Sequence, residues 1–546
     1  MSKIVLLFLL SVTLLGELSA QCGNRYNSRY FNSIQVFRDV EYSLDAPALI
    51  GATITTETTI NKDLVMDIFM PPVTDTVSQR PVVVLAHGGG FINVAFMGGT
   101  VLVGTMKNED IQALADTLAH WGFVTASIEY RLGFNIASPS SLKRAVWRGA
   151  QDMSAAIRFF RKNAAWFNID PNRVFAGGSS AGAFCAIHST FVDHTERLPE
   201  SYELVPLLKK DLGVLHSRPV VELTSFNPFS GTSVLGDDVD SIPQGVPSYW
   251  GAIADLGFMA HGNNKAPMVL FHGTNDLIVN YKSGRPFGGV ILTAPNTHGT
   301  YLMDSLMNVM NMPHSAYFAP GEGHEYWGAL NGDWLPSGPN AYWPGIIQKT
   351  TDYLYDIMRP ALPTINGPDS VLPTTNYTYS IVNPNPNYKY CWEITGGTIV
   401  SPVVNGATVE VEFFNTTTHG YVAARAVDAA QVASRNTLKY SAVSTNVSVD
   451  KISNTTIGVQ LQPNPASGYC QVLINSPRQE GTQAGWREAS SIQLFNALGQ
   501  NVLTQSIELS VGNNEERLDL KNLPTGVYRV LVTTKHSRVV QPLMIY

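Results

Sequence analysis

One serine in the chain has the sequence context of an activated nucleophile. Residues 178–182 read Gly-Ser-Ser-Ala-Gly, the pattern G-x-S-x-G, and only Ser180 fits its central position. A strand-like run ending at Ala176 precedes the motif and a helix-like run over 183–191 follows it, which is the context that the motif requires. Glycines suit so tight a turn because a Cβ there would collide with neighbouring backbone. We therefore predict a nucleophile at Ser180, against the alternative of a Gly/Ser turn that caps a helix.

A serine hydroxyl attacks a substrate only when a base takes its proton. His324 lies in a glycine-flanked loop after a predicted strand over 315–318, and Asp276 follows a predicted strand over 267–271. A carboxylate in that position can orient the imidazole and stabilise its charged form. The order Ser180, Asp276, His324 is the one expected for an α/β-hydrolase. The alternatives are an ordinary loop histidine and an ordinary turn aspartate.

A glycine-rich loop predicts a site for developing negative charge. Residues 87–91 read His-Gly-Gly-Gly-Phe and follow an apolar strand-like run. Consecutive glycines let two backbone N–H groups turn inward to hold the oxyanion of a tetrahedral intermediate. We predict the N–H groups of Gly89, Gly90 and Ala181 as donors, with His87 fastening the loop. A phosphate cradle is the rival interpretation, and it is disfavoured because no Gly-Lys-Ser/Thr follows.

Apolar runs that alternate with helical patterns must position these residues. Between about residues 30 and 360, strand-like runs such as 82–86 and 124–128 alternate with helical stretches such as 109–120 and 145–163. Buried strands that alternate with helices are typical of a mostly parallel sheet covered on both faces. The sequence therefore predicts an α/β fold whose strand ends carry the nucleophile, the acid and the base.

The composition excludes several classes of function. The 546 residues carry a net charge of −7, a pI near 6.0 and only 14% charged side chains, so no global basic field exists to hold nucleic acid or an anionic membrane. Four cysteines in so long a chain exclude a disulfide scaffold, and their spacing suggests neither a metal site nor a redox pair. Cys185 is expected to pack as a small buried apolar group.

The two ends of the chain differ from its central part. An apolar run over 4–15 predicts a secretory signal peptide at 1–20, and it is too short for the ~20 residues that span a bilayer. No later segment reaches 18 apolar residues, so no transmembrane segment is expected in the mature chain. Strand-like alternation and turn signals over 361–450, and again over 455–546, predict two small all-β sandwich domains.

Three stretches around the predicted site are similar to a known family. They are the loop 87–91, the segment Glu-Tyr-Arg-Leu-Gly at 129–133 and the run Asn-Ile-Asp-Pro-Asn-Arg-Val at 168–174. Together they make roughly residues 60–355, within a predicted catalytic domain at 21–360, resemble the carboxylesterase/lipase branch of the α/β-hydrolase fold. The resemblance implies a serine hydrolase acting on carboxylic esters without a cofactor or a metal. It places the family's nucleophile, acid, base and oxyanion glycines on Ser180, Asp276, His324, Gly89 and Gly90.

An insertion distinguishes this chain from the family pattern. It runs from about Asp193 to Gly245, between the helix after the nucleophile and the next predicted strand at 247–252. We interpret it as a lid or as one wall of the substrate pocket. Substrate preference is therefore the property that the resemblance transfers least.

The C-terminal region resembles two further modules. Residues 361–446, with Trp-Glu-Ile at 392–394, look like a polycystic-kidney-disease-like immunoglobulin-type spacer. Residues 459–546, with Leu-Pro-Thr-Gly-Val-Tyr at 523–528, look like the C-terminal sorting domain of the type IX secretion system. The latter resemblance implies a partnership with the secretion machinery and release or attachment at the cell surface.

The leading hypothesis is an exported serine esterase acting on a small or polymer-borne ester. Acetylated or feruloylated polysaccharide is one such substrate, and a group of aromatic residues has either a sugar-binding or a core role: Tyr249, Trp250, Trp327, Trp334 and Trp343. Two alternatives stay open. One is a dipeptidyl or oligopeptidase of the same fold, and the other is a surface binding protein whose hydrolase-like domain is inactive.

Overall fold

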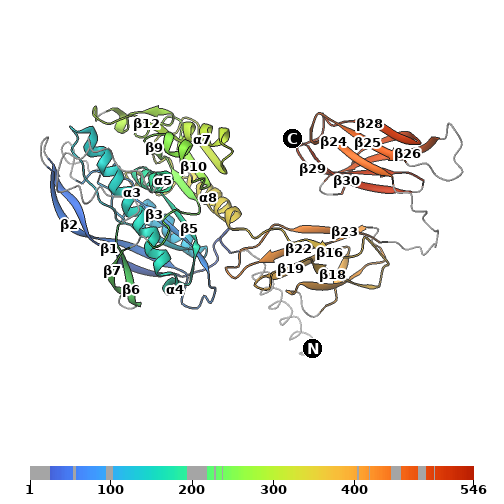
Figure 1. Cartoon of the computed structure of the whole chain (residues 1–546), viewed down its shortest axis with the longest axis horizontal. Helices are drawn as coiled ribbons and strands as arrows, with labels where there is room; N and C mark the ends of the chain where they lie inside the picture. Colours follow the sequence, from blue (N-terminus) through green and yellow to red (C-terminus); the bar gives the residue numbers. More distant parts are fainter. Residues whose placement is uncertain are drawn as a thin grey trace. The chain divides into compact units, whose positions relative to one another are not determined.

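The computed structural model describes most of the chain (Figure 1). The described residues are 25–52, 57–93, 103–192, 218–226, 229–235, 238–262, 264–289, 291–401, 405–416, 419–443, 457–476, 487–496, 499–535 and 537–545. The predicted signal peptide at 1–20 and Cys22 lie outside them. The chain divides into two compact units, Met1–Thr445 and Asn446–Tyr546.

An eight-stranded sheet organises the first unit. Its spatial order is β1 (Gln35–Ala52), β2 (Glu57–Met70), β4 (Val124–Ile128), β3 (Arg80–Ala86), β5 (Ile169–Ser179), β8 (Val246–Tyr249), β10 (Met268–Gly273) and β13 (His314–Ala319). β1, β2 and β4 pair antiparallel, and all pairs from β4 to β13 are parallel. The carboxyl ends of the parallel strands therefore meet at one edge, where the sequence puts the candidate site.

Helices cover both faces of this sheet because its strands are apolar on both sides. Alternate residues of β3 belong to two hydrophobic clusters: Val82 and Val84 pack with the helices of one face, and Val83 and Leu85 with those of the other. The first face carries α3 (Pro139–Lys162), α5 (Ala181–Phe191) and α7 (Thr300–Val309), and the second carries α2 (Glu109–His120) and α8 (Tyr342–Met358). The predicted α/β architecture is confirmed.

Short elements complete the first part of this unit. They are α4 (Ala164–Phe167), α6 (Gly257–His261), a 3₁₀ turn (Phe287–Gly289), β9 (Ala252–Ile253), β11 (Ser283–Gly284), β12 (Thr297–Gly299), β14 (Ala329–Leu330) and β15 (Asp333–Trp334). β14 and β15 form a two-stranded hairpin, and β11, β12 and β9 form a small sheet. Among the described helices, none is long and apolar enough to cross a membrane.

The described half of the insertion at 193–245 forms a hairpin of β6 (Val220–Phe226) and β7 (Phe229–Val234). Asn163 at the end of α3 donates to the carbonyl of Val221 at 2.9 Å, and Ser43 of β1 donates to the carbonyl of Pro219 at 2.6 Å. This hairpin therefore packs beside α3 and β1. Residues 193–217 lie outside the described residues.

Two four-stranded sheets follow at 361–443. One contains β16 (Ile365–Asn366), β18 (Asn376–Ile381), β21 (Thr408–Phe413) and β20 (Gly397–Ile399), and the other contains β17 (Ser370–Val371), β23 (Thr437–Val443), β22 (His419–Val427) and β19 (Lys389–Thr395). Their inner faces share one core around Tyr379, Val411 and Trp392. The predicted all-β character is confirmed, and the polycystic-kidney-disease-like assignment stays a prediction.

The loop between β22 and β23 packs on the hydrolase-like part. Ala430 and Val432 are fully buried in the hydrophobic cluster that contains α8. The Tyr26 hydroxyl donates to the carbonyl of Ala430 at 2.9 Å, and the N–H of Ala433 donates to the Tyr355 hydroxyl at 2.8 Å. The β domain therefore completes part of the core beside α8.

The second unit is a seven-stranded all-β domain. Its order is β27 (Asn501–Ser510), β26 (Arg487–Phe495), β29 (Gly526–Thr533), β30 (Arg538–Ile545), β24 (Gly458–Ser467), β25 (Tyr469–Ser476) and β28 (Gly512–Asp519). Cys470 lies in its core as a free thiol, and Cys185, on the buried face of α5, is likewise free. Cys391 is disulfide-bonded, which the spacing of the cysteines did not predict.

Candidate functional site

Ser180 occupies a tight turn between β5 and α5. Its φ of +53° lies in the left-handed region, which an L-residue adopts only under constraint. A Cβ at Gly178 would lie 2.4 Å from the carbonyl oxygen of Ala86, and one at Gly182 would lie 2.0 Å from the same atom. Both glycines are therefore required, for the reason the motif predicts. The N–H of Ser180 donates to the carbonyl of Tyr249 at 2.9 Å, which ties the turn to β8.

The structure brings Ser180, His324 and Asp276 together. His324 follows β13, and its Nε2 lies 2.9 Å from the Ser180 Oγ. Asp276 follows β10, and its Oδ2 lies 2.6 Å from the His324 Nδ1. The other carboxylate oxygen, Oδ1, accepts the N–H groups of Ile278 and Val279 at 2.8 and 2.9 Å. The geometry is that of a serine, a base and an orienting acid in line.

The charges of this group support one another. Burial opposes ionisation of Asp276, but hydrogen bonds from His272 and His324 outweigh it and hold the pKa of this carboxyl well below its usual value. Burial also opposes the imidazolium form of His324, but the hydrogen bond and charge of Asp276 outweigh it and raise the His324 pKa above 6.5. The carboxylate thus stabilises the protonated imidazole that would form when Ser180 loses its proton.

The predicted oxyanion residues border the same space. Gly89 and Gly90 have φ of +99° and +61°, which glycine adopts without strain. Together with Ala181, Ser180 and His324, both glycines line one cavity. Within the described residues, no protein acceptor takes the N–H groups of Gly89, Gly90 or Ala181. These three donors are therefore available to a ligand.

His87 holds the start of this loop. Its Nδ1 donates to the Gly88 carbonyl at 2.7 Å, and its ring stacks on Tyr130 with centroids 4.4 Å apart. Burial lowers the His87 pKa, which keeps the ring neutral. Gly104 packs against the same carbonyl, where a Cβ would approach to 2.1 Å. Because the carbonyl of Gly88 and the N–H of Gly89 belong to one planar peptide unit, fixing one orients the other.

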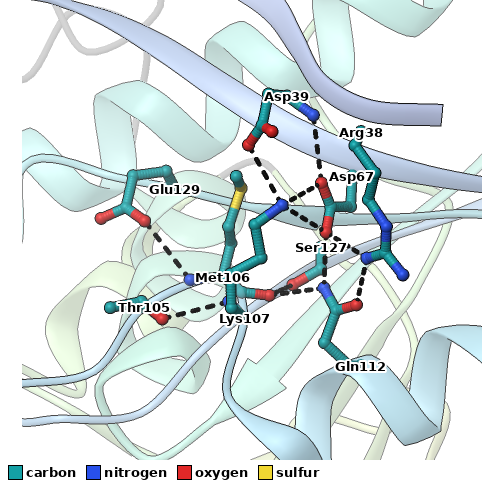
Figure 2. A network of polar contacts seen from close by, with 9 residues as sticks. All are labelled: Arg38, Asp39, Asp67, Thr105, Met106, Lys107, Gln112, Ser127 and Glu129. Carbon is teal, nitrogen blue, oxygen red and sulfur yellow. Dashed lines mark hydrogen bonds and ion pairs between the residues drawn. The ribbon is translucent and has the colours of Figure 1, made fainter.

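A polar network around Asp67 holds the segment that leads into α2 (Figure 2). Asp67 of β2 is fully buried and accepts from the Lys107 Nζ at 2.7 and 2.9 Å and from the Gln112 Nε2 at 3.0 Å. Gln112 also donates to the carbonyl of Met106 at 2.6 Å. The network thus fixes the segment just after Gly104 to the sheet and to α2.

The cavity beside Ser180 has a volume of about 640 Å³ and is mostly apolar. Phe91, Trp147, Phe184, Phe258 and Phe287 supply much of its wall. No described residue of the 193–245 insertion lines it, so the described β6–β7 hairpin is not a wall of this cavity. The cavity can take an apolar group bonded to a carbonyl carbon at Ser180.

Most of the aromatic residues for which a sugar-binding or a core role was expected belong to the hydrophobic core. Tyr249, Trp250 and Trp327 are fully buried, which favours the core alternative for them, and Trp334 and Trp343 are partly buried. The Trp250 Nε1 donates to the Ser179 Oγ at 2.9 Å, and its ring lies 6.2 Å from the His324 ring. Trp250 thus packs beneath the site.

Sequence reasoning assigned no role to Glu325, which follows His324 and lines the cavity. It is only 4% exposed and has a φ of +50°. A glutamate beside a histidine in a glycine-rich loop resembles any solvated loop residue in sequence. Only its burial, which depends on distant elements, separates it from one.

Residues 35–358 have the architecture of the α/β-hydrolase fold, as the strand order, the strained turn after β5 and the residues after β10 and β13 indicate. Residues 66–288 match the BD-FAE family model, and residues 460–546 match the model of the secretion system C-terminal sorting domain. The sorting domain marks the chain for secretion or for export to the cell surface.

Several known proteins are similar to part of the chain. Carboxylesterase 3B of Mus musculus is 35% identical over 120 residues, which are 22% of this chain and 19% of that protein. Juvenile hormone esterase of Heliothis virescens is 32% identical over 130 residues, 24% of this chain and 21% of that protein. The chain thus spans about a fifth of the length of these curated relatives. An esterase structure from Thermogutta terrifontis aligns with 59% of this chain and 95% of its own, at 17% identity and a TM-score of 0.35.

Proposed function

We propose that the protein is an exported serine esterase that uses Ser180, His324 and Asp276 through an acyl-enzyme. The observation that carries the proposal is the hydrogen-bonded line from Asp276 through His324 to the Ser180 Oγ, which opens on an apolar cavity. Matches to BD-FAE and to carboxylesterases favour an ester as the substrate.

In the first half of the reaction, His324 takes the proton of Ser180 as the oxygen attacks the ester carbonyl carbon. The resulting oxyanion accepts hydrogen bonds from the N–H groups of Gly89, Gly90 and Ala181. His324 then gives its proton to the departing alcohol. In the second half, His324 takes a proton from water, hydroxide attacks the acyl carbon, and Ser180 is released with its proton.

For the substrate we propose an ester with a bulky apolar acyl group. The 640 Å³ cavity is far larger than an acetyl group needs, and its aromatic walls suit a flat ring. Between acetylated and feruloylated polysaccharide, the cavity therefore favours the feruloylated form. We further propose that the C-terminal domain is recognised by the type IX secretion machinery.

The test is a panel of p-nitrophenyl esters from acetate to decanoate, with methyl ferulate and acetylated xylan, on the wild type and Ser180→Ala. The variant should lose on the order of 10⁶ in turnover on every ester. Retained hydrolysis by the variant would exclude Ser180 as nucleophile. Peptide cleavage in place of ester cleavage would favour the peptidase alternative, and an inert wild type would favour the binding protein.

A further inference from the structure

Glu325 joins three parts of the molecule that the proposed chemistry depends on. Its Oε2 accepts the N–H of Gly332 at 3.1 Å, which links it to the β14–β15 hairpin. Its Oε1 lies against the glycine-rich loop 87–91, the oxyanion loop. A Cβ added at Gly88 would lie 3.4 Å from this Oε1 and 3.6 Å from the Ser180 Cβ. Its backbone continues directly from His324. One side chain thus contacts the hairpin and the loop from beside the base.

The hairpin itself is anchored to the first turn of α2. The N–H of Asp110 donates to the carbonyl of Gly332 at 2.9 Å, and the Asn108 Nδ2 donates to the carbonyl of Asn331 at 2.9 Å. A Cβ at Gly332 would lie 2.4 Å from the Asn108 side chain, so the contact is tight. Glu325 therefore connects His324 to a fixed point of the scaffold.

A second buried carboxyl group affects the charge of Glu325. Asp110 is fully buried, and its Oδ2 has no protein partner among the described residues. Burial, together with the nearby charges of Glu325 and Asp333, raises the Asp110 pKa well above its usual value. Burial also raises the Glu325 pKa, while His324 and the N–H groups of Gly332 and Asn331 oppose that rise. Asp110 accepts the N–H of Ile111 at 2.6 Å but, unlike Glu325, has no cation among the groups that lower its pKa, so we assign the proton to Asp110 and the charge to Glu325.

We propose that Glu325 is a positioning residue for this site: its carboxylate holds His324 and the oxyanion loop in register and adds negative charge beside the imidazole. The charged groups that act on it are His324 and Asp276, and Glu325 in turn raises the pKa of the buried Asp110. The inference rests on the proposed function, because it assigns a role relative to Ser180 and His324.

The experiment measures kcat and KM against pH on a soluble p-nitrophenyl ester, using the full chain. Glu325→Gln keeps an acceptor for Gly332 but removes the charge, so the acidic limb of kcat/KM should move down by about half a pH unit or more. Glu325→Ala also removes the carboxylate's contacts with Gly332 and with the loop 87–91, and kcat should fall by about 10²-fold while KM changes little. Asp110→Asn mimics the neutral acid and should leave the acidic limb in place.

Glu322→Gln is the matched control, because this partly exposed carboxylate lies in the same loop and bonds the Tyr342 hydroxyl. It should leave kcat and the acidic limb near those of the wild type. A wild-type profile for Glu325→Gln would overturn the proposal, as would a shift in Asp110→Asn equal to that expected of Glu325→Gln. Ser180→Ala distinguishes failure of the proposed function from failure of the role of Glu325. If Ser180→Ala stays active, the proposed function is wrong. If Ser180→Ala is inactive and Glu325→Gln has the wild-type profile, only the role of Glu325 is refuted.

Discussion

Replacing Asp276 with asparagine should abolish most activity without changing the number of heavy atoms in the site. The carboxylate Oδ1 accepts two backbone N–H groups, from Ile278 and Val279. The asparagine carbonyl oxygen must keep that position, since an NH₂ group there would face two donors. The NH₂ group then takes the place of Oδ2, which faces the His324 Nδ1 at 2.6 Å and the His272 Nε2 at 3.1 Å.

This arrangement inverts the tautomer of the base. An NH₂ group opposite Nδ1 requires Nδ1 to accept, so the proton of neutral His324 moves to Nε2. That nitrogen lies 2.9 Å from the Ser180 Oγ and can then no longer take its proton. The same substitution in other serine triads costs on the order of 10⁴ in kcat, which equals about 5.4 kcal/mol of transition-state free energy.

The assay is kcat/KM for p-nitrophenyl ester hydrolysis between pH 5 and about pH 9, with circular dichroism to check folding. Asp240→Asn is a matched control, because the Asp240 Oδ1 accepts the N–H of Ile242 two residues on, at 3.0 Å, in an exposed turn. It should retain wild-type kinetics. A folded Asp276→Asn variant with more than about a tenth of wild-type kcat/KM would refute the tautomer argument.

In the wild type, kcat/KM should decline as pH falls through a His324 pKa above 6.5, because Asp276 favours the protonated imidazole; a midpoint below 6.5 in the profile would contradict this. Gly90→Ala should lower kcat by about 10²-fold or more, because its Cβ would lie 2.6 Å from the Phe287 ring at a φ of +61°, and steady-state kinetics would show it. A chain ending at residue 360 should melt several degrees below one ending at residue 445. Burial of a valine such as Val432 contributes about 1.5–3 kcal/mol to the free energy of unfolding, and the shorter chain lacks it. Equal melting temperatures would show that the core does not need the β domain.

Much of the hydrolase fold could be predicted because its strands are buried on both faces. The run at 124–128 is a strand with those bounds, and the helix at 109–120 likewise has the predicted ends. The candidate site could be predicted as far as its chemistry follows strand ends. Ser180, Asp276 and His324 follow the ends of three parallel strands of one sheet, so chain order was enough to expect them together.

The remainder depends on contacts that leave no local pattern. The β1–β2 hairpin was not predicted, because its register shifts at several points interrupt the alternation of apolar and polar residues. The loop that carries Ala430 and Val432 is short and has no periodicity, so its docking beside α8 is invisible in sequence. Glu325 and Asp67 are buried carboxylates, and charged residues are read as exposed unless their partners are known.

The most direct test of the central claim is covalent labelling of the full chain with a fluorophosphonate, followed by peptide mapping. Trypsin releases residues 174–197 as one peptide, which contains Ser179, Ser180 and Ser189, so fragment spectra must locate the adduct. We expect one adduct, on Ser180, that is lost in Ser180→Ala and forms much more slowly in Asp276→Asn. No labelling of the folded wild type, or an adduct on another serine, would contradict it.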